Sequence, residues 1–114
     1  MKKQQKTQNL DTYCRVMFLI QKKPKITQRE LAKELGISLG SVHYCLKALV
    51  LMGWVKIRRF NDNPDKSAYL YFLTPMGLLQ KSKLTLGFLK RKKQEYDQIK
   101  REIDQLTEDL QEDG

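Results

Sequence analysis

The sequence is poor in the residues from which catalytic and metal sites are usually built. Its 114 residues include one histidine and two cysteines, too few to provide the spaced sulfur and imidazole ligands of a zinc site. It has no glycine-rich phosphate loop and no pair of carboxylates at a catalytic spacing. We therefore expect no metal, no cofactor and no enzymatic activity.

Long apolar runs are also missing. No stretch reaches the roughly 18 consecutive apolar residues of a membrane span, and the first residues do not form the apolar region of a secretory signal. We therefore expect a cytoplasmic protein with no membrane partner, although basic charge alone would also suit an anionic lipid surface. Cys14 and Cys45 lie in apolar patterns and are expected to be small core residues. The alternative for Cys45 is a redox switch.

Acidic side chains are scarce over most of the chain. The formal net charge is +9, from 22 Lys and Arg against 13 Asp and Glu. Residues 1–87 carry 16 basic and 5 acidic side chains, a net charge of +11, whereas residues 88–114 carry 6 and 8, a net charge of −2. The positive charge of the first segment is that expected of a protein whose partner is a phosphate backbone.

Residues 26–51 predict two short helices joined by a tight turn. Thr27 and Glu30 have the spacing of a capping box, which satisfies backbone amides at the start of a helix. Gly36 can take the left-handed conformation that ends this helix, and Ser38 can cap the next one. The second helix is expected to bury an apolar face made of Val42, Cys45, Leu46, Leu49 and Val50. Such a pair is a helix-turn-helix unit, whose second helix enters the major groove of DNA; the alternative is an ordinary corner in a structural domain.

The segment before this unit divides into a polar arm and a helix. Residues 1–8 are polar and basic without periodicity, and we expect them to be a disordered arm. Residues 10–21 have the periodicity of an amphipathic helix. Its apolar face is expected to contain Leu10, Tyr13, Cys14, Met17 and Phe18. This helix would close the third side of a core that two helices cannot close alone.

Two β-rich segments follow at residues 54–60 and 67–73, separated by the turn-forming sequence NDNPDK. They predict a β-hairpin with a loop of about six residues. In the first strand, apolar and basic residues alternate along Val55, Lys56, Ile57 and Arg58. One face of that strand is therefore expected to be apolar and the other basic. The second strand is apolar on both faces, so alternation does not fix its orientation. A hairpin in this place is the wing of a winged-helix domain; the alternative is a hairpin that only covers the core.

Thr74 and Pro75 can open a further helix that runs almost to the C-terminus, either unbroken or as two helices joined at residues 83–87. Beyond that point apolar residues form a heptad seam that is interrupted once: Leu89, Tyr96, Ile99, Ile103, Leu106 and Leu110. A single helix with so narrow a seam needs a partner, and we expect a second copy of the chain. The sequence thus predicts a winged helix-turn-helix domain at 9–83 and a C-terminal dimerisation helix at 84–114.

Similarity to a known family is carried by three segments: ITQRELAKELGISLGSVHYCLKALVLMGWVKI, YFLTPMG and FLKRKKQEY. Together they resemble the MarR-like winged-helix transcriptional regulators, most closely the short branch associated with exopolysaccharide gene clusters. The resemblance covers about residues 10 to 110. It implies a regulator of transcription, here of exopolysaccharide biosynthesis genes.

Two departures from the family pattern limit what the resemblance implies. Many MarR proteins carry an Asp-x-Arg motif in the wing, whereas this tip reads NDNPDK. The contacts of the wing therefore cannot be carried over. The chain also lacks the longer terminal helices that form a ligand-responsive dimer interface in many relatives, so the small-molecule effector is unknown.

The predicted fold class is therefore mainly α (α+β), a winged helix-turn-helix domain with a long C-terminal coiled-coil helix. We expect a sequence-specific binder of double-stranded DNA, in which the helix at 38–52 reads the major groove and the wing at 54–73 reaches the flanking backbone or minor groove. Amides at the start of the preceding helix can bind a phosphate. The residues expected at the DNA are Thr27, Gln28, Ser38, Leu39, Gly40, Ser41, His43, Tyr44, Lys47, Arg58, Arg59, Asn61, Asn63 and Lys66.

Two other binding functions use the same surface. One is a winged-helix protein-interaction module without sequence-specific DNA binding, which acidic residues on the second helix would favour; residues 38–52 contain none. The other is RNA binding, for which this face offers only Tyr44 as an obvious stacking residue. Both alternatives are therefore less well supported than DNA.

Overall fold

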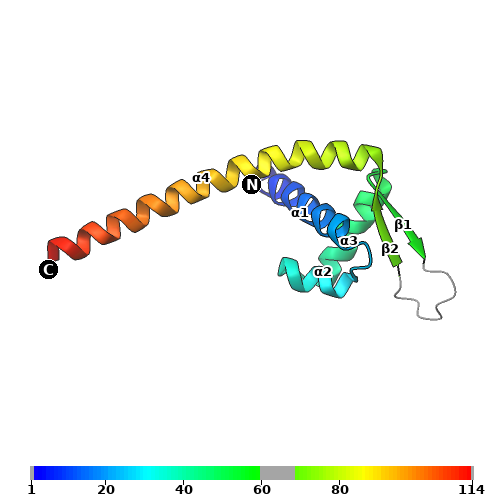
Figure 1. The fold of residues 1–114 in the computed structure, drawn as a ribbon, viewed down its shortest axis with the longest axis horizontal. Helices are drawn as coiled ribbons and strands as arrows, with labels where there is room; N and C mark the ends of the chain where they lie inside the picture. Colours follow the sequence, from blue (N-terminus) through cyan, green and yellow to red (C-terminus); the bar gives the residue numbers. More distant parts are fainter. Residues whose placement is uncertain (1, 60–68, 114) are drawn as a thin grey trace. The chain divides into compact units, whose positions relative to one another are not determined.

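The computed structural model describes residues 2–59 and 69–113, with side chains described from Asn9 onward (Figure 1). The described chain is mainly helical with a two-stranded antiparallel sheet, which confirms the predicted fold class. It contains compact units at Met1–Leu84 and Thr85–Gly114. In chain order the elements are α1 (Lys2–Lys22), α2 (Gln28–Leu35), α3 (Leu39–Leu51), β1 (Val55–Arg59), β2 (Tyr69–Leu73) and α4 (Pro75–Asp113).

The core of the Met1–Leu84 unit lies between α1, α2, α3 and the hairpin. Burying one aliphatic side chain stabilises a fold by roughly 1.5–3 kcal/mol, so each of these elements contributes to holding the others in place. Removing α1 would uncover the inner sides of α2 and α3. The buried side chains are Val16, Met17, Ile20, Ile26, Leu31, Leu35, Val42, Cys45, Leu46, Leu49, Val55 and Tyr71.

Helix α1 differs from its prediction in its start and in its buried face. It begins at Lys2, whereas residues 1–8 were expected to form a disordered arm. Leu10 and Phe18, expected in the core, are 37% and 50% exposed. The buried stripe instead includes Val16 and Ile20, which lie in the core that α1 shares with α2, α3 and β2. The Phe18 ring lies 5.2 Å from the ammonium of Lys22, a cation–π contact at the surface.

The hairpin places one side of each strand against the core. Val55 pairs with Leu73 and Ile57 with Tyr71, in an antiparallel register. Val55 and Tyr71 are buried, whereas Phe72 points to the other side and is 40% exposed, which decides the orientation that the sequence left open. Ile57 was expected on a wholly apolar face and pairs with the buried Tyr71, but it is 43% exposed because it borders an open concavity beside α3.

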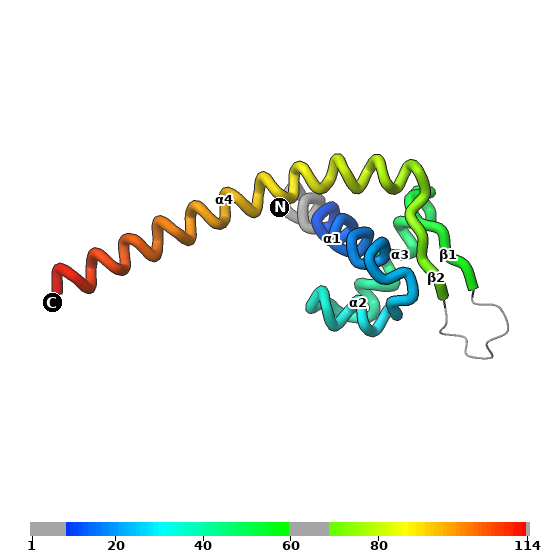
Figure 2. Tube along the Cα trace, in the orientation of Figure 1, coloured from blue at the N-terminus to red at the C-terminus, as the bar shows by residue number. Residues whose placement is uncertain are grey.

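Helix α4 is assigned as one helix, Pro75–Asp113, and Figure 2 shows β2 leading into its start. Thr74 caps it: the Gly77 amide donates to Thr74 Oγ1 at 3.0 Å, and the Thr74 hydroxyl donates to the Gly53 carbonyl at 2.6 Å. The Trp54 carbonyl accepts from the Thr74 amide at 3.0 Å. The start of α4 is therefore bound to the segment that joins α3 to β1.

Candidate nucleic-acid interface

The turn between α2 and α3 is built by local hydrogen bonds. Thr27 Oγ1 accepts from the Glu30 amide at 3.1 Å and its hydroxyl donates to the Glu30 carboxylate at 3.2 Å, so Thr27 caps α2 as predicted. Gly36 has φ 67° and ψ 33°, the left-handed conformation, and its amide donates to the Ala32 carbonyl. The axes of α2 and α3 are bent by 110°, within the range of helix-turn-helix units.

The start of α3 is fixed by two serines. Ser38 Oγ accepts from the Ser41 amide at 3.0 Å, which caps the helix as predicted, and the Ser38 hydroxyl donates to Ser41 Oγ at 2.8 Å. The Ser41 side chain is thus already engaged inside the first turn. A base contact by Ser41 would use its hydroxyl proton or the second lone pair of its oxygen, since the Ser38 hydroxyl occupies the first.

The outer side of α3 exposes the side chains that the sequence assigns to DNA. Tyr44 is 69% exposed and Leu39 46%, and His43 and Lys47 are also exposed. Val50, expected on the buried face, is 38% exposed because it borders a concavity between α3 and β1. The opposite side of the helix is buried through Val42, Cys45, Leu46 and Leu49.

That concavity brings three of the expected contact residues together. Its volume is about 250 Å³, and Gln28 at the start of α2 meets His43 and Lys47 of α3 around it. The hairpin contributes Ile57. The exposed apolar part of this rim was not expected, because only the tertiary structure places β1 beside α3; it consists of Val50, Leu51 and Ile57.

A second concavity, of about 510 Å³, lies between α1 and the start of α3. It gathers four more of the expected contact residues, Ser38, Gly40, Ser41 and Tyr44. Residues of α1 that the sequence did not assign to the interface complete its wall: Asn9, Thr12 and Tyr13. No local pattern marks these three, since their position depends on how α1 packs against α3.

The position of the hairpin relative to α2 is set by two contacts of Tyr71. Its amide donates to the Pro24 carbonyl at 3.0 Å, so the second strand is bound to the turn before α2. Its buried hydroxyl has a pKa raised by burial, and a hydrogen bond with the Gln28 side chain partly opposes that rise. Gln28 is therefore partly committed to the fold, and its backbone amide remains the group expected to meet a phosphate.

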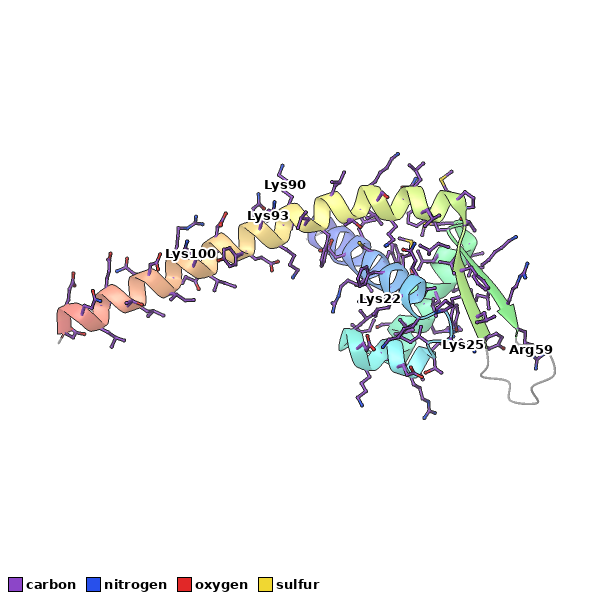
Figure 3. All side chains as sticks on the ribbon, in the orientation of Figure 1. Lys22, Lys25, Arg59, Lys90, Lys93 and Lys100 are labelled. Atoms are coloured by element: carbon purple, nitrogen blue, oxygen red, sulfur yellow. The ribbon has the colours of Figure 1, made fainter. Side chains whose placement is uncertain are left out.

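Two arginines of β1 lie on opposite faces of the hairpin. Arg58 pairs with Leu70 and Arg59 with Tyr69, and both arginines are exposed. Arg59 lies on the same side as Ile57, at the end of the described part of β1 (Figure 3). The expected contacts of the wing tip fall outside the described residues: Asn61, Asn63 and Lys66.

The ionisable groups near α3 are simple. Burial raises the pKa of the Cys45 thiol to about 12, so the thiol is protonated at neutral pH.

Among the residues that the structure describes, no group of three or more His, Cys, Asp and Glu side chains could hold a metal ion. Within the same residues, no single helix has the length and apolar composition of a membrane span, and only α2 and α3 taken together as a bent pair do.

In the Thr85–Gly114 unit, the seam predicted for dimerisation is uncovered. Its apolar side chains are between 48% and 75% exposed, although side chains of this size are normally buried in groups. The residues concerned are Leu89, Tyr96, Ile99, Ile103, Leu106 and Leu110.

Comparison with known proteins agrees with this geometry. Residues 14–56 match a family model described as winged helix-turn-helix DNA-binding. No curated protein matches the sequence. Among solved structures, the chain is similar to wild-type MarR from Escherichia coli in its apo form, with 28% identity and a TM-score of 0.54 over 72% of this chain and 67% of that one.

Two further structures have a similar fold. FabT from Streptococcus pneumoniae, solved in complex with DNA, is 26% identical over 78% of this chain and 57% of its own, with a TM-score of 0.54. The adhesin competence repressor AdcR from Streptococcus pyogenes is 20% identical over 77% of this chain, with a TM-score of 0.60. The chain spans only 63% of the length of AdcR.

Proposed function

We propose that this chain, a winged helix-turn-helix protein with the fold of the MarR-family transcription regulators, is itself a regulator that binds double-stranded DNA sequence-specifically. The observation that carries the proposal is the outer side of α3. That side is exposed and contains no acidic residue, and it lies beside β1, on which Arg58 and Arg59 are exposed. FabT, which is similar to this chain, was solved in complex with DNA, and this supports the same partner here.

Gly40 supports a close approach of DNA to the start of α3. A Cβ at this position would meet only Ser38 Oγ, at 3.9 Å, so packing inside the protein does not require a glycine. Glycine in a helix is less favourable than alanine by roughly 1 kcal/mol. A partner whose backbone lies against Gly40 would explain why the smallest residue stands at this exposed place.

The expected contacts divide by chemistry. Lys47, Arg58 and Arg59 are suited to phosphates, which fix the position of a protein on the duplex without reading its sequence. His43 and Tyr44 expose groups that can donate to or accept from base edges in the major groove. The remaining expected contacts complete the surface at the two helix starts and in the wing: Thr27, Gln28, Ser38, Leu39, Ser41, Asn61, Asn63 and Lys66.

Selection of binding sites from random double-stranded DNA tests the proposal. A regulator should select a consensus in which two half-sites lie about 34 Å apart or a multiple of that distance, because a two-fold dimer presents two copies of α3. Affinity should fall steeply with salt: for each neutralised phosphate, log K should decrease by about 0.9 for every tenfold increase in salt concentration. Equal affinity for all sequences at physiological salt would contradict sequence-specific binding, and a flat salt dependence would favour the protein-interaction module instead.

A homodimer formed through α4 belongs to the same proposal, because the exposed seam needs a partner. Ile103→Asp places a charge in the middle of the seam and should give a monomer with weaker DNA binding, since the two reading helices would no longer act together. Gln94→Asp adds the same charge away from the seam and is the control. Sedimentation of both variants measures the outcome; a dimer in Ile103→Asp would place the interface elsewhere.

The biological setting follows from the partner. We propose the cytoplasm as its location, which is the location expected from the sequence. Regulation of exopolysaccharide genes rests on the sequence resemblance alone. Chromatin immunoprecipitation would test it, because bound sites should lie in promoters of such a gene cluster.

A further inference from the structure

The seam on α4 has flanks of opposite charge. Each heptad contributes two seam residues, such as Tyr96 and Ile99. One flank of the seam consists of the residues just before the first member of each pair, and the other of the residues just after the second member. The flank before the first seam residue is acidic at Glu95, Glu102 and Asp109. The flank after the second seam residue is basic at Lys93 and Lys100, and all five side chains are exposed (Figure 3 labels the two lysines).

These flanks respond differently to the two directions in which a pair of helices can run. In a parallel pair the acidic flank of one helix lies beside the basic flank of the other, one heptad further on. Glu95 would then meet Lys100 of the second copy, and the symmetry of the dimer produces this contact twice. No pair of like charges is created along either flank.

An antiparallel pair brings like flanks together. With Ile99 packed against Ile103 of the second copy, Glu95 would face Asp109, and the flanking residues nearest the centre would face their own copies, Glu102 against Glu102 and Lys100 against Lys100. Moving the helices by one heptad does not remove the conflict, because every charged residue of the first flank is acidic and every one of the second is lysine. Like charges at these positions disfavour that orientation.

We infer that α4 pairs with α4 of a second copy as a parallel two-stranded coiled coil. The inference rests on the homodimer of the proposed function and adds its direction. Among parallel coils, Ile103 followed by Leu106 in the seam is the combination that favours two strands over three or four. Lys92, the one basic residue in the seam, is held on its own helix: its ammonium lies 3.1 Å from the Glu95 carboxylate and 5.3 Å from the Phe88 ring centroid.

Parallel pairing has a consequence for DNA binding. Both copies of the Met1–Leu84 unit are attached to the same end of the coil, so both reading helices can engage one duplex. An antiparallel coil would attach them at opposite ends. The direction of the coil therefore bears on whether one dimer can read two adjacent half-sites.

Disulfide formation measures the direction. In a parallel dimer, Leu110→Cys faces its own copy and should form an intermolecular disulfide on mild oxidation, because the two sulfurs come within bonding distance. In an antiparallel dimer, Leu110→Cys should not cross-link alone but should cross-link with Lys92→Cys in a mixture of the two variants. The wild-type chain is the control, since its Cys14 and Cys45 are buried.

Sedimentation of the same samples separates the possible failures. If the wild-type chain is a dimer and the cysteine variants cross-link only in the mixture, parallel pairing is overturned but the homodimer and its DNA binding are not. A wild-type monomer overturns the homodimer and parallel pairing together. If the wild-type chain is a dimer and Leu110→Cys alone forms the disulfide, both are supported.

Charge reversal is an independent readout that requires no new cysteine. Glu95→Lys and Lys100→Glu should each weaken the parallel homodimer about tenfold, because two attractive contacts become repulsive. Mixing the two variants should restore dimerisation as a heterodimer in which both contacts are attractive. Asp97→Lys, the same charge change away from both flanks, is the control. If Glu95→Lys instead tightens the dimer, as expected when it faces Asp109, the pairing is antiparallel.

Discussion

Gly77→Ala should destabilise the protein, because the start of α4 lies in direct contact with the backbone at Trp54. A Cβ on Gly77 would overlap the Trp54 carbonyl oxygen and lie 2.9 Å from its carbonyl carbon. Both atoms belong to the backbone, so no side-chain rotation can relieve the overlap. Helix α4 would have to move away from the segment that joins α3 to β1.

The magnitude follows from the terms that compete at this position. Overpacking of a closely packed site costs about 1–3 kcal/mol. The hydrogen bond from the Thr74 amide to the Trp54 carbonyl, 3.0 Å long, would also weaken as the two segments separate. A hydrogen bond of this kind contributes about 0.5–1.5 kcal/mol. Alanine gains up to about 1 kcal/mol over glycine in a helix, which offsets only part of the loss. We expect a net destabilisation of about 1–3 kcal/mol.

Gly87→Ala is a matched control in the same helix. A Cβ there would meet the end of the flexible Arg91 side chain at 3.3 Å, and no backbone atom of another segment lies near it. The side chain can move, so the gain in helix propensity should remain, and Gly87→Ala should stabilise the protein by up to about 1 kcal/mol.

Urea unfolding followed by circular dichroism at equal protein concentrations compares the two variants. Gly77→Ala should lower the midpoint at an unchanged slope, whereas Gly87→Ala should keep or raise it. The DNA affinity of folded Gly77→Ala should also fall, since the displaced segment leads directly into the wing. Equal midpoints for the two variants would refute the close approach of Gly77 to Trp54.

Three further outcomes are expected. Gly40→Ala should raise the free energy of unfolding by up to about 1 kcal/mol while weakening DNA binding, which urea unfolding and a binding titration measure; unchanged affinity would contradict a close approach of DNA at this residue. Lys47→Ala and Arg58→Ala should weaken binding to all sequences alike and flatten the salt slope, whereas His43→Ala should change which base is preferred, with a discrimination of roughly 1–3 kcal/mol lost. Competition with single-base DNA variants distinguishes these effects, and identical behaviour of the three proteins would refute the division into phosphate and base contacts. Burial raises the pKa of Cys45 from 9.0 to about 12, so the folded state holds the thiol proton more tightly than the unfolded chain, and this contribution to the free energy of unfolding should be complete below pH 9.0 and decline above it. The decline should be smaller in Cys45→Ala, and parallel pH profiles of unfolding for the two proteins would contradict it.

The sequence by itself determined the elements whose signals are local. Thr27, Gly36 and Ser38 mark the ends of the two helices of the helix-turn-helix unit, because each acts through hydrogen bonds or backbone angles within a few residues of itself. The buried face of α3 was predicted correctly at every position except Val50, since helical periodicity places those side chains together whatever surrounds them. The distribution of charge also follows from the sequence alone, and so do the charged flanks of the seam in α4.

The tertiary structure decided which sides of these elements are covered. Phe18 and Ile57 are apolar residues in apolar patterns, yet both are exposed, because burial depends on where the neighbouring elements end and not on the pattern within one element. The orientation of β2 was undetermined for the same reason, since both of its faces are apolar and only packing on α1 distinguishes them. Contact between Gly77 and Trp54 joins residues that are distant in sequence, and no local signal encodes how closely two backbones approach.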